Sequence, residues 1–342
     1  MPQSDETPLL AAARSGDQDA FRQLTDPYRR ELLVHCYRIL GSVDDAEDML
    51  QETLLRAWRR LETFEGRASL RSWLYKIATN ITLDTLDHQR RRTLPTTTHA
   101  ASDPRDSLPG PARDLYWLEP LPDSLIDMRP AVNPEVYYDT RESVSLAFLA
   151  VLQTLPSRQR AALLLCDVIG WNASEIAEML SMTVVAVHSA LQRARATMKN
   201  YQLSPSATSY QPDDPGTTAL LARYVAAWEA SDSMRLVAVL CEDAVLTMPP
   251  LPAWYSGRAA IQLFLDNVVF RTAGPGDIRL IATGANACPA FAVYQCGDDG
   301  VYRATALQVL TIAHGQIARI DDFLAFDDQL FVRFGLPLVA DR

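Results

Sequence analysis

The chain has 342 residues, of which 48% are hydrophobic and 22% are charged, and its formal net charge is -10. This length and apolar content indicate two or three globular domains, and the acidic balance excludes a protein that binds nucleic acid through basic charge spread over its whole surface. The sequence holds no apolar run of about 18 residues and no basic-then-apolar N-terminus, so we expect a cytoplasmic protein without a membrane segment.

Residues 1–8 are expected to form a loose tail, and residues 9–92 are expected to be helical almost throughout, with breaks at Gly41 and near Gly66. The helix after Gly41 carries acidic residues at three- and four-residue steps: Asp45, Asp48 and Glu52. The helix dipole favours such a stripe near the N-terminus, so a solvated face explains it. It also suits the docking of a basic partner helix.

Cations and aromatic rings are interleaved in residues 64–92, which include Phe64, Trp73, Tyr75 and a run of three arginines. Rings stack on bases and cations follow phosphates, so this composition is typical of a surface for single-stranded nucleic acid. For Trp73 alone, burial in a helical core is the simpler interpretation.

Residues 93–137 form a linker rich in Pro, Thr, Ser and Asp that contains the apolar stretch Leu115–Pro122. A simple tether has no need of such an insert. The stretch either packs against another domain of this chain, which we favour, or binds extended in a groove of a partner.

Residues 172–199 predict a helix-turn-helix. Asn172 and Glu175 form a capping box, and Ile176, Met179 and Leu180 face inward. The second helix has an apolar stripe, Val184, Val187, Leu191, Ala194 and Met198, beside a polar face, His188, Ser189, Gln192, Arg193, Arg195 and Lys199. Such a face suits a major groove, although a helical hairpin with a solvated basic face has the same pattern.

After a second linker at residues 202–216, residues 217–335 predict an α+β domain in which a curved antiparallel sheet wraps its helices. We expect helices at 217–231, 233–241 and 257–270. The expected strands are 244–248, 278–284, 290–296, 302–313 and 316–323, with turns at 297–300 and 314–315. Five scattered cysteines without a CxxC pair, Cys36, Cys166, Cys241, Cys288 and Cys296, predict reduced core thiols.

Three stretches in order, GSVDDAEDMLQETLLRAW, EGRASLRSWLYKIATNITLD and LPSRQRAALLLCDVIGWNASEIAEMLS, resemble the extracytoplasmic-function group of bacterial sigma factors. The resemblance implies a promoter-recognition subunit of RNA polymerase, with region 2 at residues 9–92. One face of region 2 would dock on the clamp helices of core polymerase: Asp45, Asp48, Gln51, Glu52 and Leu55.

The resemblance also implies that region 2 captures a flipped base of the -10 element and holds the melted strand, which must be kept open against the cost of unstacking. The loop would supply Arg67, Ala68 and Ser69. The following helix would supply Arg71, Trp73, Lys76, Asn80 and Asp84, and phosphates would be bound by Arg90, Arg91 and Arg92.

Region 4, at residues 138–201, would bind the polymerase flap and read the -35 element as duplex, with Pro156-Ser157 opening its middle helix. The implied contacts are Glu175, His188, Ser189, Gln192, Arg193, Arg195 and Lys199. Ser181 stands where the family commonly has Gly, and Val185, Ala186 and Ala190 stand where polar residues are usual. We therefore expect a weaker or less sequence-specific -35 contact, and strict -35 dependence in a promoter-mutation series would contradict this.

The third domain is similar to the SnoaL-like, nuclear-transport-factor-like cone fold, which some sigma factors carry at the C-terminus. Such cones commonly hold an apolar cavity, for which the candidate lining residues are Met248, Trp254, Tyr255, Phe291, Tyr294 and Phe323. Core packing is the simpler explanation for each of them. His314 is expected in a turn and Asp321-Asp322 at a strand's outer end, and no pair of residues indicates a catalytic dyad.

The sequence therefore favours a three-domain alternative sigma factor, without cofactor or metal, whose partners are core polymerase, promoter DNA and a candidate small molecule. The acidic cone would modulate promoter binding in cis. One rival is a free-standing helix-turn-helix regulator, which needs no acidic face on region 2. Another is an isomerase, cyclase or hydratase with a vestigial sigma-like front half.

Overall fold

The computed structural model describes residues 6–66, 68–86, 91–112, 114–126, 141–200, 214–326 and 328–340. It divides into two compact units. The helical unit comprises the described residues of 1–92, 125–129 and 151–202, and the sheet unit comprises those of 93–124, 130–150 and 203–342. No helix in these described ranges is long and apolar enough to cross a membrane.

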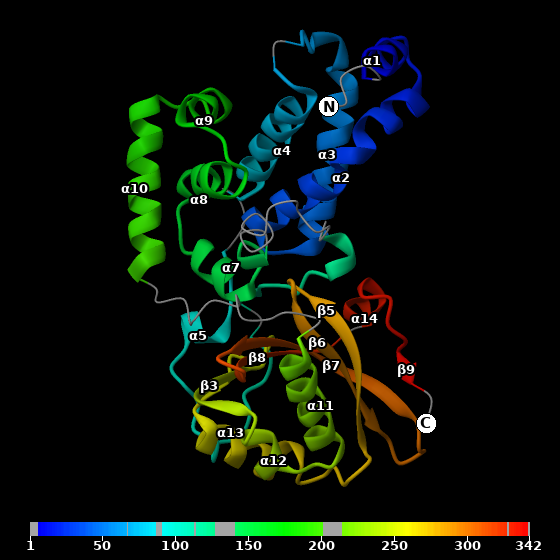
Figure 1. Cartoon of the computed structure of the whole chain (residues 1–342), viewed down its shortest axis with the longest axis vertical. Coiled ribbons are helices and arrows are strands. Elements are labelled where there is room, and N and C mark those ends of the chain that lie inside the picture. The colour runs from blue at the N-terminus through cyan, green and yellow to red at the C-terminus, as the bar shows by residue number, and fades with distance from the viewer. Residues whose placement is uncertain are drawn as a thin grey trace. The chain divides into compact units, whose positions relative to one another are not determined.

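The helical unit begins with four helices and a short 3-10 turn (Figure 1): α1 Glu6–Arg14, α2 Gln18–Leu40, α3 Val43–Arg59, η1 Leu61–Thr63 and α4 Leu70–Leu86. The predicted break at Gly41 is confirmed. Gly41 ends α2 with a φ of 75°, and the Ser42 hydroxyl caps α3 by accepting a hydrogen bond from Asp45 N at 3.2 Å.

Two features of this region differ from the prediction. The first helix begins at Glu6, inside the stretch expected as a tail, and a further break falls at Gly16, where φ is 97°. The break is followed by Asp17, whose carboxylate caps α2 by accepting from the backbone N–H groups of Asp19 and Ala20.

The rest of the helical unit is built from four short elements and one long helix, α10. They are α7 Leu146–Leu152, which begins in the sheet unit, α8 Ser157–Leu163, its π-helical extension η3 Leu164–Val168, α9 Ala173–Met179 and α10 Val184–Asn200. The middle helix opens at Ser157 directly after Pro156, as predicted. Figure 1 shows α9 and α10 joined by a tight turn.

The sheet unit contains a seven-stranded sheet in the order β4-β3-β8-β7-β6-β5, with β9 paired to β7. Its strands are β3 Leu240–Thr247, β4 Trp254–Ser256, β5 Ile278–Ala285, β6 Cys288–Cys296, β7 Tyr302–Ala313, β8 Gln316–Leu324 and β9 Val339–Ala340. The consecutive strands β5 to β8 are antiparallel, whereas β3 runs parallel to β8. This meander confirms the predicted α+β class.

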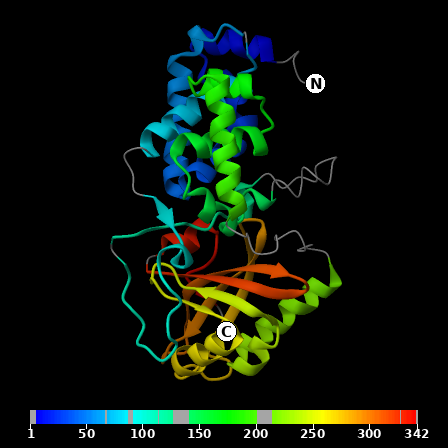
Figure 2. The same ribbon diagram turned by 90° about the vertical axis from the view of Figure 1, so that its left-hand side faces the viewer.

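Helices cover one face of this sheet (Figure 2) and close a buried core beneath them. They are α11 Pro215–Glu229, α12 Ser233–Val237 and α13 Arg258–Phe264, the last continued by the π-helical turn η5 Leu265–Val269. Tyr224 and Trp228 of α11 and Phe264 of α13 meet Phe291 and Leu310 of the sheet in that core.

The predicted helix 233–241 was wrong at its end. The helix stops at Val237, and Leu240 begins β3 because it pairs with Ile317 of β8, a contact between distant segments that overrides local helix preference. The short strands β4 and β9 and the helix α14 Gln329–Arg333 were not predicted.

The apolar stretch of the first linker packs against the sheet domain of the same chain, as we favoured. Leu118 and Leu121 are fully buried, and the backbone of Leu121 exchanges two hydrogen bonds with Asn286, at 2.9 Å and 2.8 Å. The linker also contains short elements: β1 Arg92–Thr93, α5 Pro95–Thr98, β2 Tyr116–Trp117 and η2 Asp123–Leu125.

Candidate functional site

The acidic face of α3 has three exposed side chains, and two of its carboxylates already form ion pairs within the protein. Asp48, Gln51 and Leu55 face solvent, and Leu55 is 42% exposed although it is a large apolar residue. Asp45 is already paired with Arg92 at 2.7 Å, and Glu52 with Arg56 at 2.6 Å. The face thus combines an exposed leucine with carboxylates, which suits a partner with apolar and basic side chains.

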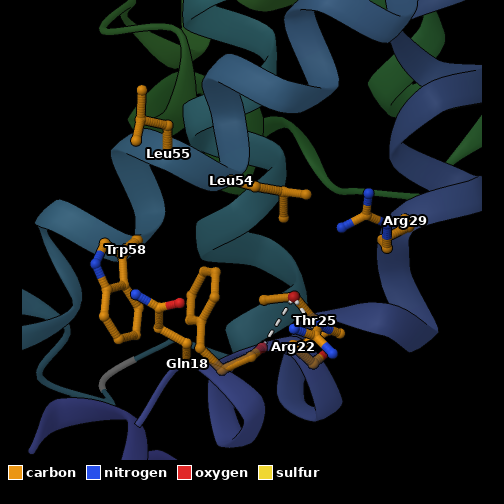
Figure 3. A pocket seen from close by; sticks show the side chains of 8 residues that line it. Gln18, Arg22, Thr25, Arg29, Leu54, Leu55 and Trp58 are labelled. Atoms are coloured by element: carbon orange, nitrogen blue, oxygen red, sulfur yellow. Dashed lines mark hydrogen bonds between the residues drawn. The ribbon is translucent and has the colours of Figure 1, made fainter. Parts of the chain in front are cut away.

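A pocket of about 330 Å³ lies beside this face, between α2 and α3 (Figure 3). Its apolar lining includes the Phe21 and Trp58 rings, whose centroids are 5.1 Å apart, and two arginines of α2 contribute to it. The full lining is Gln18, Phe21, Arg22, Thr25, Arg29, Leu54, Leu55 and Trp58. No local sequence pattern indicates this pocket, because only the packing of α2 on α3 brings the lining residues of the two helices together.

The helix expected to approach the melted strand, α4, has some of its candidate residues engaged inside the protein. Arg71 donates two hydrogen bonds to Glu31 at 3.0 Å and a third at 2.8 Å, and its guanidinium lies 4.9 Å from the centre of the Tyr75 ring. The half-buried Trp73 packs on Phe64, with ring centroids 5.1 Å apart. Arg71 and Trp73 therefore have a structural role whatever else they contact.

The remaining candidates of the -10 set divide into exposed residues and cations with partners. Ala68, Ser69, Asn80 and Asp84 are exposed. Lys76 lies 3.8 Å from the Glu178 carboxylate, and Arg91 donates to Thr154 O at 3.3 Å. Arg67 and Arg90 lie outside the described residues.

The predicted capping box at the start of α9 is confirmed. Asn172 Oδ1 accepts from the N–H groups of Ser174 and Glu175 at 3.0 Å and 3.1 Å, and the Glu175 carboxylate accepts from Asn172 N at 2.9 Å. Ile176, Met179 and Leu180 are buried, as predicted. Ser181 forms the turn with a φ of 52°, a left-handed conformation that glycine adopts without strain.

The polar face of α10 is largely as predicted, with His188, Gln192, Arg193 and Lys199 exposed. Arg195 is exposed but pairs with Asp167 at 2.5 Å. Ser189 is half-buried, and its hydroxyl donates to Val185 O at 3.0 Å. In the apolar stripe Val187, Leu191 and Ala194 are buried and Met198 is half-buried.

Two residues of α10 differ from the prediction. Val184 is 41% exposed because it lies in the first turn, beyond the part of α10 that packs on its neighbours. Ala190 is buried, so it belongs to the packing stripe and not to a base-reading face. Val185 is 75% exposed and is the apolar residue that α10 presents most openly.

The six candidate cavity residues of the sheet domain do not line one cavity. Met248, Tyr255 and Phe291 belong to the core under the helices. Tyr294 is an odd number of residues from Phe291 along β6, so it points to the opposite face of the sheet, where its ring packs on Phe331. Phe323 pairs with Leu307 on that face too, and the Trp254 indole donates to His99 O at 2.9 Å.

Asp321 and Asp322 lie inside β8 and are buried, so the expected position at a strand's outer end was wrong. Asp321 is held by Arg319 and by the Thr247 hydroxyl at 2.7 Å. Burial raises the pKa of Asp322 to about 7. Asp322 pairs across the sheet with Gln308, which accepts a hydrogen bond from Tyr224 at 2.7 Å. His314 lies in a turn, as predicted.

Comparison with known proteins follows the same division of the chain. Residues 24–92 match the family described as Sigma-70 region 2, and residues 145–198 match the family described as Sigma-70, region 4. The chain is 46% identical over 328 residues to the ECF RNA polymerase sigma factor SigG of Mycobacterium tuberculosis, covering 96% of this chain and 86% of SigG.

A second relative from Mycobacterium tuberculosis extends the similarity to a solved structure. The ECF RNA polymerase sigma factor SigJ is 28% identical over 304 residues, covering 86% of this chain and 88% of SigJ. The crystal structure of SigJ has a TM-score of 0.57 at 24% identity, with 91% of this chain and 98% of SigJ covered. The similarity of the two structures shows that this chain and SigJ share a fold.

Proposed function

The chain belongs to the extracytoplasmic-function RNA polymerase sigma factors, and on this premise we propose that it brings core RNA polymerase to specific promoters. Region 2 would engage the polymerase and the melted -10 strand, and region 4 the -35 duplex. The identity to SigG across 96% of the chain is the observation that carries this proposal. A sigma factor is a specificity subunit, and the chain is not an enzyme.

The α3 face is our proposed contact with the polymerase clamp. Asp48, Gln51 and Leu55 are its exposed centre, and the half-buried Glu52 lies among them, one turn after Asp48. Asp45 is a weaker candidate, because its carboxylate already holds Arg92. Exposed carboxylates around one apolar residue provide electrostatic attraction at the rim and burial at the centre.

A charge reversal tests this contact. The double variant Asp48→Lys, Glu52→Lys should lower the affinity for core polymerase by at least about tenfold, because cations then face a basic surface. The matched control Glu62→Lys, Glu242→Lys makes the same change of charge at exposed sites outside the face. A pull-down with core polymerase and run-off transcription give the result. A variant that still binds and transcribes like the control would favour the rival, a free-standing DNA-binding regulator.

The loop before α4 and the outer side of α4 form our proposed -10 surface. Ala68 and Ser69 are exposed in the loop, close to Gly66, whose φ is 73°. Asn80 is exposed on α4 itself. An exposed loop with small side chains leaves room for a flipped base, and an amide can read its edge. Lys76, one turn before Asn80 on α4, supplies positive charge to the same side of the helix once its ion pair with Glu178 is released, and Arg91 supplies a further cation after the helix.

The exposed side of α10 is our proposed -35 surface. His188, Gln192 and Arg193 offer donors for base edges, and Lys199 offers charge for a phosphate. The N-terminal turn of a recognition helix usually enters the groove, and here it presents Val185 instead of a polar group. This composition supports a -35 contact dominated by phosphates, with little sequence discrimination.

We also propose that the C-terminal sheet domain modulates the sigma regions in cis. The segments on both sides of the gap between regions 2 and 4 are held by the tip of the β5–β6 hairpin. Asn286 binds Leu121 and donates from its amide to Val144 O at 2.7 Å. Asp123 accepts from Ala287 N at 2.8 Å, and Arg141 donates to Ala287 O.

This attachment shortens the free tether between the two DNA-binding regions. The segments around Leu121 and Val144 are attached to the sheet domain. Fewer linker residues than the whole of 93–137 are therefore left free to span the distance between region 2 and region 4. A shorter tether restricts the separations that the regions can reach. A ligand of the sheet domain that loosened the hairpin tip would lengthen the tether, which gives the domain a route to control promoter binding.

A further inference from the structure

One exposed row of side chains runs along α10, and its chemistry changes along the helix. Val185, His188 and Gln192 follow one another at steps of three and four residues, so they lie on the same side of the helix. All three are exposed, whereas Val187 and Ala194 on the opposite side are buried. The row therefore begins with an apolar side chain and continues with side chains that form hydrogen bonds.

The first turn of α10 presents mainly apolar surface. Val185 is 75% exposed and Val184 is 41% exposed, and Val185 is the most exposed large apolar side chain among the described residues. The hydroxyl groups nearby are used by the helix itself. Thr183 Oγ1 accepts a hydrogen bond from Ala186 N at 3.2 Å, and the Ser189 hydroxyl donates to Val185 O at 3.0 Å. This turn therefore offers a partner mainly methyl groups.

The place of this valine gives its exposure a meaning that a valine elsewhere on a surface does not have. Val185 lies in the first turn of the second helix of a helix-turn-helix, within the residues that match Sigma-70, region 4. The N-terminal residues of such a helix contact base edges in the major groove. Among the four standard bases, only thymine presents an apolar group there, its 5-methyl group.

We propose that Val185 reads the 5-methyl group of a thymine in the -35 element, and that this contact supplies the sequence discrimination of the first turn of α10. This inference rests on the proposed function, because it takes the exposed side of α10 as the -35 surface. His188 and Gln192 then contact base edges further along the same row.

The expected discrimination is small. Loss of one buried methyl group should lower the affinity about fourfold, the equivalent of about 0.8 kcal/mol. A bidentate hydrogen bond to a base discriminates more strongly, by about 5- to 150-fold. An apolar contact at this position therefore agrees with a -35 element that is read weakly.

Replacement of thymine by deoxyuridine tests the contact from the DNA side, because it removes the 5-methyl group and keeps every hydrogen-bonding atom of the base. Core polymerase carrying the full chain first selects promoters from a duplex library randomised upstream of the transcription start. Each thymine of the selected -35 element is then replaced in turn, on both strands. At one thymine the affinity of the polymerase complex should fall about fourfold. A selected element without thymine, or one that tolerates deoxyuridine everywhere, would overturn the inference.

Variants of Val185 test the same contact from the protein side. Val185→Ser should bring the ratio of affinities for thymine and deoxyuridine at that position to about one, whereas Val185→Ile keeps an apolar contact and should keep the ratio. Val332→Ser is the matched control, because Val332 is 64% exposed and lies on α14 of the sheet domain. Any effect of deoxyuridine on the duplex itself is the same for all four proteins. If Val185→Ser kept the full ratio, or only weakened the binding of core polymerase without DNA, Val185 would not be the residue that reads the methyl group.

Transcription separates this inference from the proposed function. If the polymerase complex transcribes no member of the library, the proposed function is contradicted together with the inference. If it transcribes and deoxyuridine has no effect at any -35 position, only the reading of thymine by Val185 is contradicted.

Discussion

Replacing Asn286 by Gly should release the linker from the sheet domain and change transcription. The Asn286 side chain makes two hydrogen bonds to backbone groups of the linker, one from Leu121 N at 2.9 Å and one to Val144 O at 2.7 Å. Its φ is 54°, so glycine fits the turn without strain and the hairpin itself should survive. The substitution therefore removes the two side-chain hydrogen bonds of the attachment, keeps the backbone bond from residue 286 to Leu121 O, and leaves the turn.

The expected size follows from these two bonds. Each contributes about 1 kcal/mol net, and a buried group left without its partner costs about 1–3 kcal/mol until it meets water. A weakening of about 2–3 kcal/mol corresponds to an increase of about 30- to 150-fold in the local opening of the linker.

Hydrogen exchange of the Leu121 amide measures that opening, and run-off transcription with core polymerase measures its consequence. His314→Gly is the matched control, because His314 is also a turn residue with positive φ, 51°, but is exposed and lies in the β7–β8 turn. If exchange at Leu121 rose as expected while transcription stayed equal to the control, modulation in cis through the linker would be refuted. If exchange did not rise, the Asn286 side chain would not be what holds the linker.

Two further predictions concern stability. Burial, with help from Arg38 and Arg71, lowers the pKa of His35 from 6.5 to about 3, so the folded state binds fewer protons than the unfolded state and stability should fall as the pH drops from about 6.5 towards 3. The loss is at most about 5 kcal/mol, and His35→Gln should remove most of it in urea unfolding measured against pH; an unchanged pH profile would contradict the assignment. Ser181→Gly should raise the free energy of unfolding by roughly 0.5–1 kcal/mol because φ is 52° there, measured against Ser174→Gly, which should not stabilise.

Local signals predicted much of the helix-turn-helix. The capping box of Asn172 and Glu175 depends on residues three apart, and the buried stripe of Val187, Leu191 and Ala194 depends on helical periodicity, so both could be predicted from the sequence. The resemblance to the family placed Ala190 where polar residues are usual, but it is buried. An alanine fits a packed face and an exposed face alike, and only the neighbouring helix decides which it lies on.

The sheet domain shows the same limit. Its long strands alternate strongly enough to be predicted within a few residues, but β3 was placed four residues too late because its first residues pair with β8, more than seventy positions away. Tyr294 and Phe291 look equivalent as aromatic cavity residues, yet the register of β6 puts them on opposite faces.

By itself the sequence determined the order of the helical regions and the α+β domain, the cap and the polar face of the helix-turn-helix, because these depend on spacing along a few turns or one strand. The tertiary structure alone decided which charged groups have partners. Arg71 meets Glu31, Lys76 meets Glu178, and Arg160 reaches Ile39 across 121 residues. Pairing of charges depends on distances between elements that are remote in sequence, and no local pattern encodes those distances.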